Sequence, residues 1–362
     1  MGHWFERLYS GLSKSQVNIS KAMGTKEFEY RAAQLSKMGI TKDNYYVGTR
    51  DGAIPERFFD NIDAVYISSP NSLHFTQTMQ SLRKGKYAIV EKALATNERD
   101  FRNVLRYIAK SGIEKRVYLH LHYMHKQLVL AMPGILAGLT KEYGRIRSAS
   151  GTFFEKISES DKRRKWLFSM SEGGLFMDWI HPYEVLFYGA LAKQVKLDKA
   201  NLFIMDKDFG SDASGIETVS SIKGKYFASG AMGSMRIAKG AKESIKSVVF
   251  GFDDGIRAEF IFLSSEEEFG TGKRGTFRLL QNKAGKEIGI RKYEASGPDT
   301  SEIFAKDIES LCCDGPNPGL SMDEIKKLYG PQWEFQRITN GVTPESGIEE
   351  VESFVRRGEQ HI

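Results

Sequence analysis

The chain of 362 residues contains only two cysteines, Cys312 and Cys313, and they are neighbours in the sequence. Neighbouring cysteines rarely pair without strain, and one pair cannot form the framework of bridges that stabilises small secreted domains. The sequence therefore falls outside the disulfide-rich secreted class. Such sparse cysteine is typical of a reducing compartment, and the cytoplasm is the predicted location.

Long apolar runs and charge of a single sign are also missing. No stretch reaches the ~18 consecutive apolar residues that a membrane-spanning helix requires, and the N-terminus lacks the apolar segment of a signal peptide. The net charge is +6, and the one dense basic run, Lys162–Lys165, is short. Scattered charge is typical of a solvated surface, so we expect neither a nucleic-acid nor a membrane partner.

Length and patterning predict an α/β chain of two domains and a tail, because single cores stop growing at roughly 250–300 residues. Over residues 1–121 strand and helix patterns alternate, which predicts a doubly wound parallel sheet of the dinucleotide-binding (Rossmann) kind. Over residues 122–338 many strands alternate apolar and polar residues, which predicts an α+β domain with a large open antiparallel sheet. Residues 339–362 carry the pattern of a short amphipathic helix.

Residues 63–92 are the most informative part of the chain and form a strand–loop–helix–strand unit. Ala64–Ile67 and Tyr87–Val90 are short apolar runs typical of strands buried on both faces. Pro70, in the loop Ser69-Pro70-Asn71, cannot continue a central strand, and Gly85 occupies the position of a helix C-terminal cap. Ligands of such sheets bind outside the carboxyl ends of the strands. The loop and the pair Glu91-Lys92 are therefore predicted at the ligand-binding edge.

Asp178 and His181 are three residues apart, so on a helix both side chains face the same direction. An imidazole with a carboxylate nearby is suited to take the proton from an alcohol. The alternative is a core histidine that packs beside Trp179. The residue types favour the acid–base interpretation.

Three histidines, His120, His122 and His125, cluster at the end of the strand predicted over residues 116–121. A His-x-His pair on a strand places both rings on one face, which is one arrangement that binds a metal. No nearby cysteine or carboxylate completes a ligand set, so we predict no metal. We expect this strand to end at the ligand cleft, with His122, Tyr123 and His125 lining its pocket.

Three separated motifs carry a resemblance to a known family. They are D-A-V-Y-I-S-S-P-N-S-L-H at residues 63–74, G-K-Y-A-I-V-E-K-A-L-A at 85–95 and G-G-L-F-M-D-W-I-H at 173–181. In order and spacing they resemble the Gfo/Idh/MocA family of glucose–fructose oxidoreductases and inositol dehydrogenases, and the resemblance covers nearly the whole chain. It implies a dinucleotide-binding domain, an open-sheet substrate domain, and hydride transfer between NAD(P) and a hydroxyl of a sugar or polyol.

The resemblance implies catalytic roles for Lys92, Asp178 and His181. Lys92 matches the lysine of the family's E-K-P motif and would donate a hydrogen bond to the reacting oxygen, its pKa lowered by burial and a nearby cationic ring. His181 would act as the base, and Asp178 would support both. Ala93 replaces the family's proline, and the usual glycine between the aspartate and the histidine is missing. From position alone, a surface lysine paired with Glu91 is an equal alternative.

Two aromatic residues extend the expected substrate site. Tyr183 would serve as an alternative acid, because related enzymes use a tyrosine near this place. Trp166 stands at the spacing where relatives carry a Trp-Arg wall, and a tryptophan face stacks well on the C–H surface of a sugar. Core packing is the alternative for Trp166.

The front of the chain lacks a feature that a dinucleotide-binding fold needs, namely a first strand followed by G-x-G-x-x-G. Gly2-His3-Trp4 resembles only the second half of that motif as it enters its helix. Two interpretations compete, a clipped start and a variant that has lost its central strand. We favour clipping, because losing that strand would expose apolar surface and two unpaired strand edges.

The residues after the strand predicted over 17–23 indicate which nucleotide is bound. An NAD enzyme would place Asp or Glu there to hold the ribose 2′-hydroxyl. Thr25, Lys26 and Arg31 stand there instead, and a hydroxyl with cations suits a 2′-phosphate, so NADP is preferred over NAD. The alternative is a charged helix start without a ligand. Further cofactor contacts are expected from Ser69, Pro70, Asn71, His74, Glu91 and Lys92.

Together these features predict an NADP-dependent dehydrogenase that oxidises an aldose such as glucose or xylose. One alternative is a non-catalytic relative that binds a nucleotide or a sugar. Another is a dehydrogenase of the same fold that acts on an inositol or a trans-dihydrodiol. By analogy with the family, we expect a homodimer or homotetramer.

Overall fold

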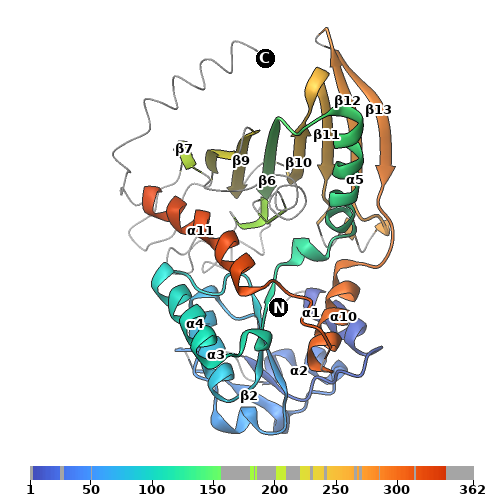
Figure 1. Cartoon of the computed structure of the whole chain (residues 1–362). Coiled ribbons are helices and arrows are strands. Elements are labelled where there is room, and N and C mark those ends of the chain that lie inside the picture. The colour runs from blue at the N-terminus through green and yellow to red at the C-terminus, as the bar shows by residue number, and fades with distance from the viewer. Residues whose placement is uncertain are drawn as a thin grey trace.

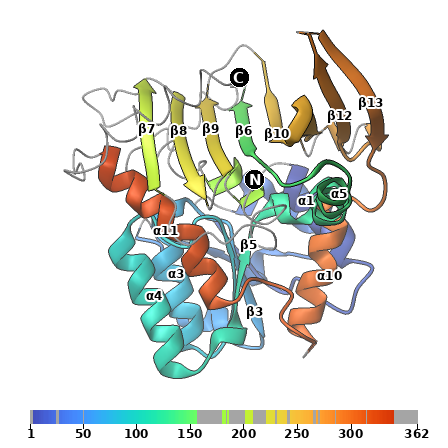
Figure 2. The ribbon, with the colours of Figure 1, turned by 45° about the horizontal axis from the view of Figure 1, so that its top comes forward.

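The computed structural model places a parallel-sheet layer below a larger, mostly antiparallel sheet (Figure 1). Helix α11 (Met322–Thr339) lies between the large sheet and the helices of the lower layer in both ribbon views (Figures 1 and 2). No described helix is long and apolar enough to cross a membrane. The structure describes residues 3–24, 28–49, 51–155, 180–182, 184–185, 201–208, 221–228, 231–239, 243–264, 267–268, 271–284, 286–313 and 315–339.

Among the described residues, the lower layer contains five parallel strands in two groups. Strands β1 (Ala22–Gly24) and β2 (Tyr45–Val47) pair with each other, and β3 (Ala64–Ile67), β4 (Tyr87–Glu91) and β5 (Val117–His120) form a second sheet in that order. Along the chain, helices separate the successive strands of both groups, as the alternating pattern predicted. This arrangement confirms the predicted Rossmann-like layer.

The β3–β4–β5 sheet is buried on both faces, which explains why its strands are almost wholly apolar. Ala88 and Val90 of β4 belong to the core that includes residues of the flanking helices α3 (Asn71–Arg83) and α4 (Glu98–Ser111). Ile89 points the other way, into a second core built with helices α1 (His3–Leu12) and α10 (Thr300–Cys312). The carboxyl end of the sheet is therefore held rigidly from two sides.

Helix α4 shows how the sequence sets these elements. The side chain of Asn97 accepts a hydrogen bond from the backbone N–H of Asp100 and caps the first turn. Gly112 ends the helix with φ +62°, a left-handed conformation that glycine adopts without a steric cost. The buried residues of the helix recur at helical spacing and face the sheet: Phe101, Val104, Leu105 and Ile108.

The large sheet has eight strands in the order β13-β12-β11-β10-β6-β9-β8-β7 (Figure 2). All neighbours are antiparallel except β6 and β9, which are parallel. The strands are β6 (Ser148–Glu155), β7 (Asn201–Asp208), β8 (Ser221–Ala228), β9 (Ala231–Lys239), β10 (Ile245–Gly251), β11 (Ile256–Ile261), β12 (Thr276–Lys283) and β13 (Lys286–Glu294). The predicted open-sheet domain is thus confirmed, with one parallel pair that the sequence pattern did not indicate.

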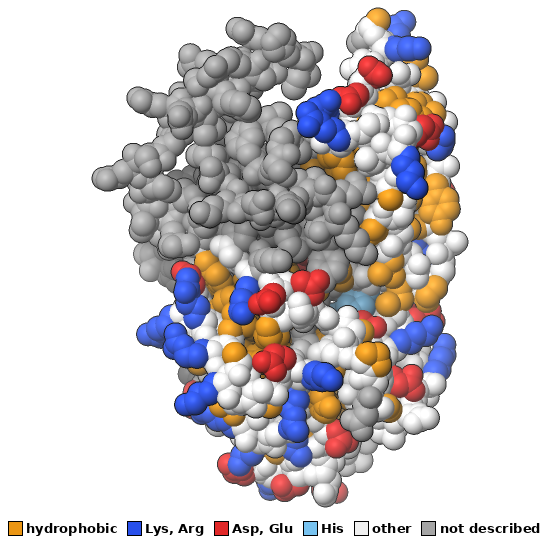
Figure 3. All heavy atoms as spheres, viewed as in Figure 1, with side chains coloured by type: hydrophobic (Ala, Val, Ile, Leu, Met, Phe, Trp, Pro, Cys, Tyr) orange, Lys and Arg blue, Asp and Glu red, His pale blue; other side chains and the backbone are white. Residues whose placement is uncertain are grey.

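One face of the large sheet is covered, whereas its edge strand β13 is exposed. In β11 the residues Ile256, Ala258 and Phe260 are buried at every second position, under helix α5 (Gln127–Tyr143) and its surroundings. Every residue of β13 is exposed, and hydrophobic side chains gather along this side of the molecule (Figure 3). Over the lower layer in the same view, basic and acidic side chains are interspersed, as the scattered charge of the sequence predicted.

One predicted element differs from the structure near the N-terminus. The strand expected over residues 17–23 is shorter, because only Ala22–Gly24 pairs with β2. Lys21 instead donates hydrogen bonds to the carbonyl oxygens of Arg57 and Asp60. Between β1 and β2 lie the 3-10 helix η1 (Phe28–Arg31) and α2 (Ala32–Lys37). The predicted tail helix, residues 339–362, lies almost entirely outside the described residues.

Candidate active site

The carboxyl ends of β3, β4 and β5 meet at one edge of the parallel sheet, and we refer to this edge as the ligand edge. Ile67 of β3 pairs with Val90 of β4, and Glu91 pairs with His120 at the end of β5. The loop 68–70, Lys92 and the 3-10 helix η5 (His122–His125) therefore follow three adjacent strands. Tyr123 of η5 packs against Phe153 of β6, so the ligand edge faces the large sheet.

Glu91 turns its carboxylate toward the neighbouring strands. Its Oε1 accepts hydrogen bonds from the Tyr66 hydroxyl at 2.7 Å and from His120 Nδ1 at 2.7 Å. Burial opposes ionisation, but the charge and hydrogen bond of His120 and the hydrogen bond of Tyr66 lower the pKa of Glu91 to about 2. These contacts give Glu91 a role in fixing the backbone that carries Lys92.

The depressed pKa of Glu91 predicts a specific loss of stability in acid. At pH values above 4.5, the ordinary pKa of a glutamate, the ionised carboxylate of Glu91 stabilises the fold. This contribution disappears as the pH falls from 4.5 toward about 2. A shift of this size corresponds to about 3 kcal/mol. In urea unfolding between pH 7 and pH 3, Glu91→Gln should lose less stability with falling pH than the wild type. Equal pH slopes would contradict the assignment; Glu142→Gln, which removes an exposed carboxylate, serves as the control.

His74 connects the loop after β3 to the turn that follows Lys92. Its Nδ1 lies 2.7 Å from the carbonyl oxygen of Ala93, and its Nε2 lies 2.8 Å from that of Ser69. His74 belongs to α3, and its ring is buried. In this arrangement the side chain of His74 positions two loops of the ligand edge rather than presenting a nitrogen to solvent.

His181 lies beside His122 and Tyr123 of η5. The ring centroids of His181 and His122 are 4.6 Å apart, and those of His181 and Tyr123 are 5.0 Å apart. Burial, together with the positive fields of His181, Lys126, His120 and Lys92, lowers the pKa of His122 well below its ordinary value, which favours a neutral ring. The structure thus brings His181, distant in sequence, to the strand end next to Lys92.

Glu184 is a buried carboxyl group that the sequence predictions did not include. Its Oε2 lies 3.6 Å from His181 Nδ1, and its side chain is fully buried. Burial raises the pKa of Glu184 well above its ordinary value, against the opposing fields of Lys92 and the backbone N–H groups of Tyr123 and Met124. The three-residue spacing from His181 was the signal that could have identified it.

His120 and His122 point in different directions, so they do not form the one-face pair that a metal site on a strand would need. The strand ends at His120, whose ring stacks on Phe304 of α10 at 3.6 Å between centroids. The chain then turns into η5, and His122 faces His181 instead. His125 contacts Tyr118 and Asp307. Among the described residues, no group of three His, Cys, Asp or Glu side chains is placed to hold a metal ion.

The remaining predicted site residues fall into two groups. His3 and Trp4 belong to helix α1, and Arg31 ends η1. The others lie outside the described residues: Gly2, Thr25, Lys26, Trp166, Asp178 and Tyr183.

Comparison with known proteins gives a family match over the N-terminal part of the chain. Residues 27–118 match the family model GFO_IDH_MocA, described as the oxidoreductase family with an NAD-binding Rossmann fold. A stretch of 53 residues is 38% identical to a 1,5-anhydro-D-fructose reductase from Ensifer adhaerens, and it spans 15% of this chain and 16% of that protein's length. Residues 27–118 therefore resemble the NAD-binding Rossmann domain of this oxidoreductase family.

Solved structures share the fold over nearly the whole chain. The aldose-aldose oxidoreductase from Caulobacter crescentus, complexed with glycerol, has a TM-score of 0.68 at 16% identity and covers 94% of this chain and 96% of its own. Levoglucosan dehydrogenase, in complex with NADH and levoglucosan, gives 0.70 at 17% identity, with 96% and 95% covered. A 3-ketoreductase from Actinomadura kijaniata, in complex with NADP and TDP-benzene, gives 0.67 at 12% identity, with 94% and 95% covered. At these identities the likeness establishes the fold.

Proposed function

We propose that this protein is an NADP-dependent sugar dehydrogenase that oxidises an aldose, such as glucose or xylose, at a hydroxyl-bearing carbon. The observation that carries the proposal is the convergence at the ligand edge. Lys92 follows β4 there, and the His181–His122–Tyr123 cluster adjoins the end of the neighbouring strand β5. A cation and an imidazole at the carboxyl edge of a dinucleotide-binding sheet suit alcohol oxidation.

The chemistry divides between the cofactor and the side chains. When bound, the nicotinamide ring supplies the acceptor for the hydride. Lys92 donates a hydrogen bond to the reacting oxygen, and the imidazole of His181 takes the hydroxyl proton. Glu184, whose raised pKa favours the protonated acid, has its Oε2 3.6 Å from His181 Nδ1 and would help to orient the ring. Asp178 is proposed to support this pair.

The ligand edge fits a nicotinamide dinucleotide by its chemistry. Helix α3 begins at Asn71, shortly after β3 ends, and this places the positive end of its dipole at the ligand edge. Its N-cap residue, Pro70, makes no side-chain cap hydrogen bond. Ser69, Pro70 and Asn71 would hold the cofactor's phosphate and ribose side, and Lys92 would lie near the nicotinamide. Gly2, His3, Trp4, Thr25, Lys26 and Arg31 are proposed to bind the adenosine half and its 2′-phosphate.

A reduction assay tests the proposal. The purified protein would be incubated with NADP or NAD and a panel of aldoses, inositols and dihydrodiols, and absorbance of the reduced nicotinamide would be followed at ~340 nm. We expect reduction with at least one aldose and a lower KM for NADP than for NAD. Absence of reduction with every compound would reject the dehydrogenase, whereas activity only with inositols or dihydrodiols would reject the aldose.

The proposal includes a homodimer or homotetramer. Ile288, Ile290 and Tyr293 of β13 are exposed large hydrophobic residues on one edge strand, and such a side is typical of a surface that another subunit covers. Light scattering of the purified protein measures this directly.

A further inference from the structure

The covered face of the large sheet changes from apolar to charged at one end. On β6, Gly151 and Phe153 are buried at alternate positions, and Glu155 continues the same face. On the neighbouring strand β10, Lys246 pairs with Phe153 in register and lies on the same face as the buried Val248. Two charged residues thus extend a hydrophobic surface toward the ligand edge.

The two charges contact each other and adjoin the active-site cluster. Lys246 Nζ lies 2.9 Å from Glu155 Oε1, and the two side chains are 14% and 44% exposed. Tyr123 lies beside them, with its ring 5.1 Å from Phe153 and 5.0 Å from His181 between centroids. Burial raises the pKa of Tyr123, while Lys246 acts against this rise. Burial also disfavours the ammonium, yet Tyr123 and Glu155 hold the pKa of Lys246 above its ordinary value.

Packing alone does not explain a cation at this position. Removing an ammonium group from water is unfavourable, and an ion pair with one half-exposed partner offsets that cost only in part. A methionine or leucine would cover the same apolar surface without a desolvation cost. Charged groups held in this way are concentrated at functional sites. The position beside Tyr123 and His181 makes substrate recognition the function that fits.

We propose that Lys246, oriented by Glu155, binds a hydroxyl of the sugar other than the one that is oxidised. This inference rests on the proposed function and deepens it. An ammonium group has three N–H donors, so it serves Glu155 and a ligand oxygen at the same time. Hydroxyls on adjacent sugar carbons are close together, so a sugar whose reacting hydroxyl is held at His181 presents a second hydroxyl toward this pair. The ligand class is therefore a polyhydroxylated sugar rather than a simple alcohol.

The test compares Lys246→Met with Lys273→Met, which removes the lysine of a surface ion pair of the same domain, Lys273–Glu294. Lys246→Met is expected to raise the KM for the sugar about 10- to 100-fold and to change kcat less than about 3-fold. Lys273→Met should match the wild type. Against a series of monodeoxy sugars, the wild type should lose activity with one analogue in particular, and Lys246→Met should no longer distinguish that analogue from the parent sugar.

Two further measurements separate recognition from folding. Circular dichroism and the dissociation constant for NADP should be unchanged in Lys246→Met, and Lys246→Arg, which keeps the charge, should recover part of the KM. If the methionine variant does not fold, Lys246→Gln provides the same comparison. Equal KM values and equal deoxy-sugar discrimination in Lys246→Met and Lys273→Met would overturn the inference and leave the dehydrogenase intact. A wild type inert with every sugar would overturn both.

Discussion

Lys92→Met is expected to lower kcat for sugar oxidation by roughly 10²- to 10⁴-fold, the range typical for loss of a group that assists proton transfer. The substitution keeps the length of the side chain but removes the donor that would polarise the reacting oxygen. Lys92 is half-buried at the end of β4, and its strand is held by the Glu91 contacts. The fold should therefore change little, which separates catalysis from stability.

Lys110→Met is the matched control, because Lys110 lies exposed in the last turn of α4, in the same domain. It should retain wild-type kcat and KM. Steady-state kinetics of both variants, together with NADP titration by fluorescence, distinguish the outcomes. A Lys92→Met enzyme with more than about a third of the wild-type kcat would show that Lys92 has no part in the chemistry.

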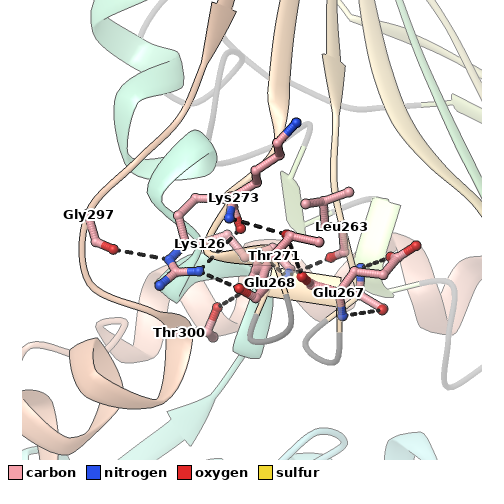
Figure 4. Close-up of polar contacts among 10 residues, drawn as sticks. Lys126, Leu263, Glu267, Glu268, Thr271, Lys273, Gly297 and Thr300 are labelled. Carbon is pink, nitrogen blue, oxygen red and sulfur yellow. Dashed lines mark hydrogen bonds and ion pairs between the residues drawn. The ribbon is translucent and has the colours of Figure 1, made fainter.

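Lys126→Met is expected to lower the free energy of unfolding by about 3–5 kcal/mol, because it leaves a carboxylate buried without its partner. Lys126 Nζ lies 2.7 Å from Glu268 Oε1 and 2.9 Å from the carbonyl oxygen of Leu263 (Figure 4). The two side chains are 1% and 2% exposed. Glu268 also accepts a hydrogen bond from Thr300 at 2.9 Å, so the pair joins α5, the loop after β11 and α10.

Two further variants test this ion pair, one at the buried pair itself and one at an exposed pair. Lys126→Met combined with Glu268→Leu should recover most of the stability, since no charge is then left unpaired. Lys326→Met removes an exposed lysine that pairs with Asp323 and should change stability by less than about 0.5 kcal/mol. Urea unfolding measures all three variants. A loss below about 1 kcal/mol in Lys126→Met would mean that water reaches Glu268.

Patterns of local sequence were sufficient to predict most of the parallel layer. Ala64–Ile67 and Tyr87–Val90 are apolar because both faces of the sheet are covered, and Gly85 caps α3 with φ +69°. The short β2 strand, Tyr45–Val47, was not predicted, because three residues are too few to show a period. The parallel pairing of β6 with β9 depends on how the chain returns to the sheet, which no local pattern records.

For the candidate site, the motifs indicated which residue types to expect but not where each side chain points. Lys92 follows β4 at the ligand edge and His181 contacts His122 at the end of β5, and their roles stay predictions. His120 turns toward Phe304 and Glu91, because β5 ends there and the next turn changes the direction of the side chains. Glu184 and Lys246 were missed, since a single charged residue in a strand or helix pattern looks like a solvated position until tertiary packing buries it.

The central claim is that a hydride passes between a sugar carbon and a nicotinamide at the ligand edge. It is tested most directly with an aldose deuterated at the carbon that is oxidised, identified in the reduction assay, incubated with NADP and the protein. Mass spectrometry of the reduced cofactor should show one deuterium per molecule, and Lys92→Met should lower the rate of its formation without changing the label. Reduced cofactor without deuterium, or no reduced cofactor from any sugar, would contradict the account.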